Sequence, residues 1–497
     1  MFLSLFPSEI ISQILEFSPE STLSLLYTGD TLLRSKMRYR TSAALSANSE
    51  VMKLIHAKCE IVFLSSKACP RFREIGCLSS LETLILSDAS LTEIPAELGS
   101  LLSLRKLDLS LNNLKSVPSK LRYLSSLRTL DLSYNNLMSI PTELGFLSSL
   151  ETFDLSANQL TWIPGQLGGL FSLRTLNLTC NKLTSIPAEL GRLSLLRSLY
   201  LCNNKLTWIP AKLGSLSSLQ ILNLHRNGLT SIPAELGSLQ FLRQLILSSN
   251  KLTSVPTELR FLRSLQRLKL SRNNFISVST QLGSLASLEE LDLSFNQLTS
   301  IPPQLSSLLS LKTLNLCNNQ LTVIPVELGS LSSLQKLNLS YNKLTSIPSE
   351  LGSLSSLRSL YVSRNNLISI PPELGSLSLL RALDLSHNAL KVIPDELNSL
   401  SLLWSLNLSH NKLSRIFNKF SLKSLKVLNL YENEIYIFPD SFYAPSLAVL
   451  NIARNYIKYK YLPGGIQYIT HRPQKVGEEI HYGWYGGLTI RRPYYYD

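Results

Sequence analysis

Apolar residues recur along most of this chain in one fixed frame, Leu-x-x-Leu-x-Leu-x-x-Asn. The frame appears seventeen times between Leu81 and Asn455, and its first fifteen copies, from Leu81 to Leu403, are spaced by 23 residues without slippage. Within one copy, Leu337 and Leu339 alternate with polar residues as they do on a strand with one buried face. The frame therefore predicts one short strand per copy, stacked beside the strands of its neighbours.

The residues after each predicted strand indicate how the chain returns to begin the next one. In the copy that begins at Leu334, Asn342 lies where the chain turns. A buried amide at that point can bond the open backbone groups of its own and neighbouring coils. Pro348 suits the first turn of a short helix, and Gly352 suits its end. We therefore expect a ladder of asparagines and one closed coil per copy.

Coils stacked in this way form a solenoid of the α/β class. Strands about 4.8 Å apart, opposite bulkier return segments, force a curve that places the parallel sheet on the inside. Seventeen such strands give an inner face roughly 80 Å long. Small-molecule pockets are much more compact than that. The pattern therefore favours the binding of a macromolecule on the inner face.

The repeats resemble those of a known family. Residues 344–367 read LTSIPSELGSLSSLRSLYVSRNNL, which is similar to the Ras-group and plant intracellular class of leucine-rich repeat proteins. The resemblance covers about three quarters of the chain. It implies a horseshoe with a parallel inner sheet and short helical or 3-10 return segments, and a non-enzymatic role as a scaffold, receptor or ligase subunit.

The chain divides into four predicted regions. Residues 1–41 read as short helices, 42–80 as a helix and a degenerate capping repeat, 81–455 as the array, and 456–497 as a tyrosine-rich cap and tail. In the second region, Ile61 and Phe63 fall one period before Leu84 and Leu86. This spacing predicts one additional strand at the start of the sheet.

The N-terminal region has an apolar stripe of its own. The pairs Phe6-Pro7, Glu9-Ile10 and Ile14-Leu15, followed by Leu23 to Leu26, resemble the pattern of an F-box. The resemblance implies docking to the adaptor of a cullin ubiquitin ligase through an apolar contact made by Pro7, Ile10, Ile14, Leu15 and Leu23. In the alternative, these helices only cap the solenoid, whose end coil would otherwise expose its leucines. The chain is then a signalling scaffold like the Ras-group proteins.

Exposed strand positions, where repeats need not agree, are expected to select the partner. The central exposed column is mostly Asp or Asn, and it is interrupted by Tyr200, Ile246, Lys269 and Tyr361. Positive charge is added nearby by Arg226, Arg243, Arg267, Arg272 and Arg364. Tyr and Arg are enriched at binding hot spots. We expect the stretch from Tyr200 to Arg272 to be the core of a site for an acidic protein surface; neutral variation between near-identical copies is the alternative.

The charge of the chain agrees with an acidic partner. Lys and Arg number 48 against 34 Asp and Glu, which gives a formal net charge of +14. This charge is spread over the chain without a basic run or a recognition helix, so nucleic acid is disfavoured as a partner. Attraction to acidic proteins explains the balance equally well.

The residue types that carry chemistry are scattered. The six cysteines have no ligand-like spacing, and the six histidines lie on separate segments without a paired nucleophile. His387 and His410 share a column in adjacent repeats, and we interpret this pair as polar surface. The sequence therefore predicts no enzyme activity, no metal site and no cofactor.

The sequence lacks the features expected of a secreted or membrane protein. No apolar run approaches the roughly 20 residues of a membrane helix, and the N-terminus lacks a basic segment before its apolar stretch. The segment after Asn455 has no cysteine, whereas extracellular members of the repeat class usually carry flanking cysteine clusters. We expect a cytoplasmic protein without membrane contact, with the nucleus as an alternative location.

Overall fold

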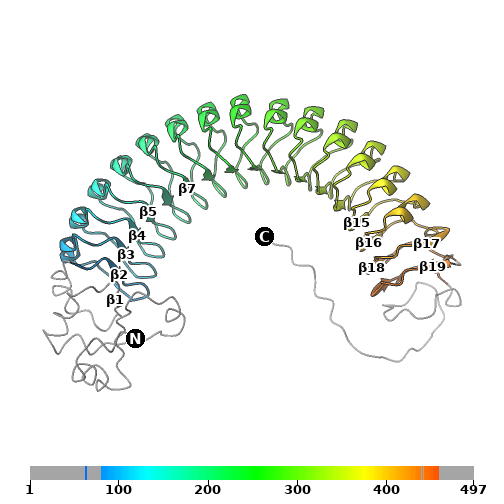
Figure 1. Cartoon of the computed structure of the whole chain (residues 1–497), viewed down its shortest axis with the longest axis horizontal. Helices are drawn as coiled ribbons and strands as arrows, with labels where there is room; N and C mark the ends of the chain where they lie inside the picture. Colours follow the sequence, from blue (N-terminus) through cyan, green and yellow to red (C-terminus); the bar gives the residue numbers. More distant parts are fainter. Residues whose placement is uncertain (1–61, 64–79, 438, 440, 458–497) are drawn as a thin grey trace, which may run out of the picture.

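The chain forms an arc of stacked coils, with strands on its inside and short helices on its outside (Figure 1). The computed structural model describes residues 62–63, 80–437, 439 and 441–457. Its main sheet has 18 strands, and the strands pair in parallel, as β2 and β3 do. The predicted α/β solenoid with a parallel inner sheet is confirmed.

The strands of the inner sheet are short, and from β2 onward each has three residues with a buried residue in the middle. They are β1 (Val62–Phe63), β2 (Thr83–Ile85), β3 (Lys106–Asp108), β4 (Thr129–Asp131), β5 (Thr152–Asp154), β6 (Thr175–Asn177), β7 (Ser198–Tyr200), β8 (Ile221–Asn223), β9 (Gln244–Ile246), β10 (Arg267–Lys269), β11 (Glu290–Asp292), β12 (Thr313–Asn315), β13 (Lys336–Asn338), β14 (Ser359–Tyr361), β15 (Ala382–Asp384), β16 (Ser405–Asn407), β18 (Val427–Asn429) and β20 (Val449–Asn451). The side chains of the first and third residues of each three-residue strand lie on the inner face.

The return segments are 3-10 helices of five residues, as the repeat pattern predicts. They are η5 (Ala96–Ser100), η6 (Ser119–Tyr123), η7 (Thr142–Phe146), η8 (Gly165–Gly169), η9 (Ala188–Arg192), η10 (Ala211–Ser215), η11 (Ala234–Ser238), η12 (Thr257–Phe261), η13 (Thr280–Ser284), η14 (Pro303–Ser307), η15 (Val326–Ser330), η16 (Ser349–Ser353), η17 (Pro372–Ser376) and η18 (Asp395–Ser399). A proline precedes each helix except η13, where the Ser279 hydroxyl accepts a bond from the Gln281 N–H at 3.3 Å. Ser279 thus caps the helix in place of proline.

The expected asparagine ladder joins the coils. The Asn273 Nδ2 donates to the carbonyls of Leu247 and Leu270 at 3.0 Å, and its Oδ1 accepts from the Leu252 N–H at 3.0 Å. The same geometry repeats from Asn112 to the last coil, while Ala89 holds the ladder position in the first coil. Each amide therefore satisfies backbone groups of its own coil and of the coil before it.

The glycines of the 3-10 helices have a role that differs from the one predicted. Gly352 lies inside η16 rather than at its end, and a Cβ on it would lie 2.3 Å from the carbonyl oxygen of Glu373 in the next coil. Asn398 occupies the same place in η18, where its Nδ2 donates to the corresponding carbonyl, that of Lys419, at 2.8 Å. At Gly352 the constraint is therefore the close approach of adjacent coils and not a helix cap, whereas Arg122, Arg260 and Ser306 occupy the same place in η6, η12 and η14.

The first strand departs from the predicted register. Val62 pairs with Leu84, whereas a constant 23-residue period predicts that Ile61 pairs with Leu84. The alignment was wrong by one residue, because this coil takes a 22-residue step like the one that joins Ser405 to Val427. The helix expected within 42–80 and the tail beyond Ile457 lie outside the described residues.

The last two coils also differ on the outer side. Here β17 (Lys419–Ser421) and β19 (Ser441–Tyr443) pair in parallel where earlier coils have 3-10 helices (Figure 1). Phe420 stacks on Phe442 with ring centroids 4.4 Å apart. Aromatic residues favour strands, and these coils lack the Pro-x-x-Leu-Gly segment of the others, so the outer strand replaces the helix.

Candidate functional site

The predicted site residues take two kinds of position on the inner face. Tyr200, Ile246 and Lys269 end β7, β9 and β10, and Arg267 begins β10. All four are at least partly exposed beside fully buried leucines. Because parallel strands keep their residues in register, these side chains lie in neighbouring columns of one surface.

A second set of positions follows each strand. In every coil of the array, the residue just before the ladder position has a positive φ, for example 52° at Arg226, 54° at Arg272 and 55° at Arg364. This backbone conformation is unfavourable for residues other than glycine, and the ladder bonds on both sides stabilise it. The three arginines are exposed and stand along the rim where the strands end.

Seven of the nine predicted partner residues gather on four neighbouring coils, those of β7 to β10. We call this group the inner-face patch; it consists of Tyr200, Arg226, Arg243, Ile246, Arg267, Lys269 and Arg272. Tyr361 and Arg364 belong to the coil of β14, four coils beyond β10, which is roughly 19 Å at ordinary strand spacing. The structure therefore separates these two residues from the rest.

The charges of the patch are not all equivalent. Arg267 and Lys269 share the carboxylate of Glu290, at 3.6 and 3.2 Å. In the part of the chain that the structure describes, no carboxylate lies within ion-pair distance of Arg226, Arg243 or Arg272. The guanidinium of Arg272 rests over the ring of Phe295 at 4.5 Å. Three arginines of the patch therefore have no ion-pair partner among the described residues, and Arg267 and Lys269 together keep one positive charge beyond that of Glu290.

Two further residues of the same coils escaped the sequence analysis. A column otherwise rich in serine contains Cys202 and His225 beside the patch, and this interruption was the available signal. The His225 Nδ1 lies 3.0 Å from the carbonyl oxygen of Ser248, to which it must donate. Partial burial lowers the pKa of His225, and the charges of Arg226 and Arg272 lower it further.

The residues around β14 continue into a rim of stacked planar groups. The Arg364 guanidinium lies 5.0 Å from the ring centroid of Tyr341, and His387 stacks on His410 with centroids 3.9 Å apart. Burial, His410 and Arg364 lower the pKa of His387.

Among the described residues, no group of three or more His, Cys, Asp or Glu side chains could hold a metal ion.

The first coils of the inner face are acidic. Asp108, Asp131 and Asp154 end three successive strands, and each accepts a bond from the backbone N–H two residues later. Burial raises the pKa of Asp131, against the bonds from Ser133, and the charges of Asp154 and Asp108 raise it further. These carboxylates help to hold the turns that follow β3, β4 and β5.

The Cys317 thiol of the inner face is not an activated nucleophile. Burial, aided by the charge of Asp292, raises the pKa of Cys317 to about 11. A thiol with such a pKa is almost wholly protonated at neutral pH, whereas catalytic cysteines have a lowered pKa.

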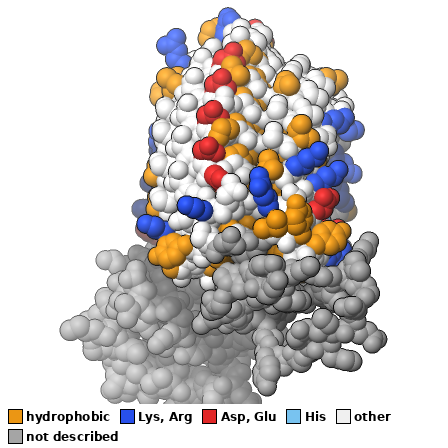
Figure 2. Space-filling model, turned by 90° about the vertical axis from the view of Figure 1, so that its right-hand side faces the viewer, with side chains coloured by type: hydrophobic (Ala, Val, Ile, Leu, Met, Phe, Trp, Pro, Cys, Tyr) orange, Lys and Arg blue, Asp and Glu red, His pale blue; other side chains and the backbone are white. Residues whose placement is uncertain are grey.

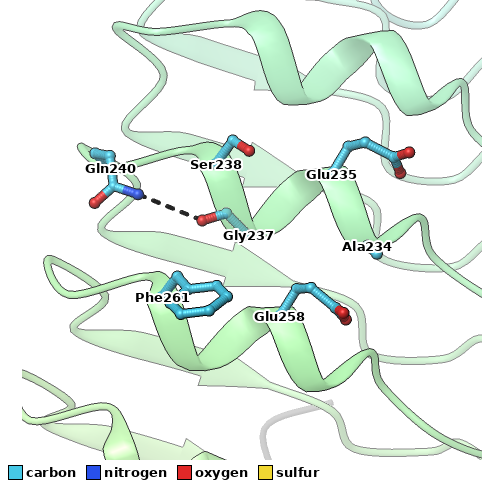
Figure 3. A pocket seen from close by; sticks show the side chains of 7 residues that line it. All are labelled: Ala234, Glu235, Gly237, Ser238, Gln240, Glu258 and Phe261. Atoms are coloured by element: carbon cyan, nitrogen blue, oxygen red, sulfur yellow. Dashed lines mark hydrogen bonds between the residues drawn. The ribbon is translucent and has the colours of Figure 1, made fainter.

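The outer side has a hollow and a row of carboxylates (Figure 2) among its described residues. A hollow of about 410 Å³ lies across η11 and η12, and Figure 3 shows Glu235 and Glu258 on one side of it, away from Gln240 and Phe261. Figure 2 shows acidic side chains in a row along the outer side of the later coils. The first turns of η15 to η18 carry Glu327, Glu350, Glu373 and Glu396. An acidic partner is therefore disfavoured over this row of carboxylates, on the coils of η15 to η18.

Family models match most of the chain. A model described as leucine-rich repeat region matches residues 49–186 and 173–302, and one described as leucine rich repeat matches 286–344, 309–367 and 355–413. The chain belongs to the leucine-rich repeat family. The array is accordingly a protein–protein interaction module, and such modules are generally not enzymes.

Solved structures of the same family are similar over most of the array. A leucine-rich repeat protein of Leptospira interrogans is 34% identical, with 73% of this chain and 93% of that chain covered and a TM-score of 0.68. The Arabidopsis receptor kinase HAESA, solved with the peptide hormone IDA and the co-receptor SERK1, is 32% identical, with coverages of 80% and 70% and a TM-score of 0.64. The plant peptide hormone receptor RGFR1, solved with RGF2, is 30% identical, with coverages of 76% and 71% and a TM-score of 0.60.

A comparison with curated protein sequences finds no match. Among the residues that the structure describes, no helix is long and apolar enough to cross a membrane.

Proposed function

We propose that this leucine-rich repeat protein binds an acidic surface of a partner protein with its inner-face patch. One observation carries the proposal: four neighbouring coils combine Tyr200 and Ile246 with three arginines that lack a carboxylate partner among the described residues. A protein interface commonly has an apolar or aromatic centre and a polar rim. Here Ile246 lies between the coils of Arg226 and Lys269, which matches that arrangement.

The similar solved structures support a protein or peptide as the partner. HAESA is solved with a peptide hormone and a co-receptor, and RGFR1 with RGF2. The acidic character of the partner is argued from charge alone. Opposite potentials attract across an interface, and unpaired guanidinium groups bind carboxylates through two parallel hydrogen bonds.

Site-specific crosslinking tests the proposed surface. With a photoreactive phenylalanine analogue in place of Tyr200, we expect crosslinking to a specific protein in cells that make this chain, because Tyr200 lies within the patch. The same analogue at Phe261, on the outer side, is the control. Mass spectrometry then identifies the crosslinked segment of the partner, which we expect to be rich in Asp and Glu.

Charge reversal gives the second arm of the experiment. Arg243→Glu should reduce the crosslink at Tyr200 about tenfold or more, the effect of a hot-spot arginine. Arg358→Glu is the matched control, since Arg358 is exposed and occupies the same position of its coil, next to β14. Equal crosslinking at positions 200 and 261, or equal loss with both charge reversals, would contradict a site over β7–β10.

The N-terminal region carries a second part of the proposal. Its F-box-like residues Pro7, Ile10, Ile14, Leu15 and Leu23 lie outside the described residues. On their sequence pattern, we propose that residues 1–41 bind the adaptor of a cullin ubiquitin ligase in the cytoplasm or nucleus. The chain then acts as a substrate-recognition subunit, with the inner-face patch holding the substrate. A signalling scaffold that lacks the adaptor is the alternative function.

Co-purification with the adaptor separates these two functions. We expect the full chain to retain the adaptor and the Ile14→Asp variant to lose it, because a charge in an apolar contact costs several kcal/mol (about 2 or more). Ile276→Asp is the control, since Ile276 is an exposed isoleucine of the array, 59% accessible. Circular dichroism checks that both variants fold. Failure of the unaltered chain to retain the adaptor would favour the scaffold.

A further inference from the structure

The imidazole ring of His225 is fixed on the inner face by a hydrogen bond to the backbone. The residue follows β8, and its ring is fixed by the bond from Nδ1 to the Ser248 carbonyl. The same carbonyl accepts the backbone N–H of Arg226 at 3.0 Å, so the ring and this arginine are anchored at one point. With Nδ1 committed as a donor, Nε2 is the nitrogen that can gain a proton.

The surroundings of His225 favour its neutral form. The coil of β7 brings Tyr200 and Cys202, its own coil brings Arg226, and the coil of β10 brings Lys269 and Arg272. The coil of β9 brings Ile246, Ser248 and Ser249, none of which is ionisable in the physiological range, and Arg243 directly before its strand. No carboxylate among the residues that the structure describes pairs with His225. The histidine therefore faces positive charge without a compensating anion.

The two arginines nearest to His225 leave space between them. Arg226 and Arg272 occupy the same rim position two coils apart, roughly 10 Å at ordinary strand spacing. Ser249 holds that position in the coil between them, with a small side chain. An anionic group above Ser249 lies beside the rim position of Arg226 and the coil of His225, and Arg272 reaches it when its guanidinium turns away from the Phe295 ring.

We propose that His225, Arg226 and Arg272 form an anion subsite for an Asp or Glu carboxylate of the partner, and that His225 takes up a proton from solvent when this carboxylate binds. The inference rests on the proposed function of the inner-face patch and adds to it a particular contact. The protonated Nε2 donates to the bound carboxylate beside the guanidinium groups.

The direction of the pH effect follows from the charges. In the free protein, burial and the arginines lower the pKa of His225. A bound carboxylate favours the protonated ring and raises that pKa. Because the bound state holds more protons, the affinity rises as the pH falls through the interval between the two pKa values. The carboxylates of the ligand stay ionised in this range.

Binding of a synthetic acidic peptide tests the inference. The probe is a rhodamine-labelled chain of glutamates, with its affinity for the full protein measured by fluorescence anisotropy near pH 8 and near pH 6 (about two units apart) at constant ionic strength. We expect the affinity to rise about threefold or more toward the lower pH, because the tenfold limit of one unit of pKa coupling is reached only below the lowered pKa of the free histidine. In His225→Gln the peptide should still bind, with less than about twofold change between the two pH values.

His387→Gln is the matched control. His387 is also a histidine of the rim region with a lowered pKa, but it lies outside the inner-face patch, so this variant should keep the pH effect of the unaltered protein. Equal affinity at both pH values, an undiminished effect in His225→Gln, or no binding of the peptide would each overturn the subsite. Crosslinking at Tyr200 is independent of these outcomes, so the subsite can fail while the proposed partner surface stands.

Discussion

Replacement of Asn273 by alanine is expected to lower the free energy of unfolding by about 3 kcal/mol. The side-chain amide donates to Leu247, Leu270 and Ser271, and it accepts from Leu252. Alanine leaves these backbone groups without their partner in a buried turn, and each unsatisfied group costs about 1–3 kcal/mol, moderated by relaxation. Urea denaturation followed by circular dichroism measures the change.

Asn274→Ala is the control for this experiment. Asn274 is the next residue of the same coil and is exposed. Its substitution should change the free energy of unfolding by no more than about 0.5 kcal/mol. If the two variants were equally stable, the ladder would not be a main source of cohesion between coils.

Gly352→Ala is expected to destabilise the protein by about 2 kcal/mol. Helix propensity alone predicts the opposite sign, since alanine is favoured over glycine by about 1 kcal/mol within a helix. The added Cβ, however, would lie 2.3 Å from the Glu373 carbonyl oxygen, so the backbone of the next coil must move. The same denaturation experiment gives the sign.

Gly228→Ala controls for loss of glycine itself. Around Gly228, the nearest atom to an added Cβ is the Leu206 carbonyl oxygen at 3.4 Å, an ordinary contact. We expect less than about 0.5 kcal/mol of change there. A stabilised Gly352→Ala variant would mean that the coils separate easily, and the close-approach explanation would fail.

The sequence predicts the array well because its periods are set by burial. The alternation of Leu337 and Leu339 admits one register in the array, since a slip by one residue would expose both leucines. At the first strand this argument has no force. Ile61, Val62 and Phe63 are all apolar, so the pattern fits either register, and the pairing follows Val62 to Leu84.

The sequence predicts which residues of the candidate site lie on the inner face, but not which of them contact one another. Departures from the Asp or Asn column found Tyr200 and Ile246. That Glu290 pairs with both Arg267 and Lys269, whereas Arg226 has no such partner among the described residues, depends on distances between coils that the sequence does not contain. His225 was missed because a single histidine among serines is by itself uninformative. Its bond to the Ser248 carbonyl, which fixes the ring and leaves Nε2 to gain a proton, is visible only in the structure.

The 23-residue step also makes the reach of this molecule adjustable. Elements of one coil contact those of the coils beside it, as η15 contacts η16 and β12 contacts β13. A duplication or loss of one whole unit between β2 and β7 would leave the contacts of every other coil intact. It would move the inner-face patch by about 4.8 Å relative to the start of the sheet. Unequal recombination within such a gene thus changes the distance between the start of the sheet and the inner-face patch. The residues of the patch itself stay unaltered.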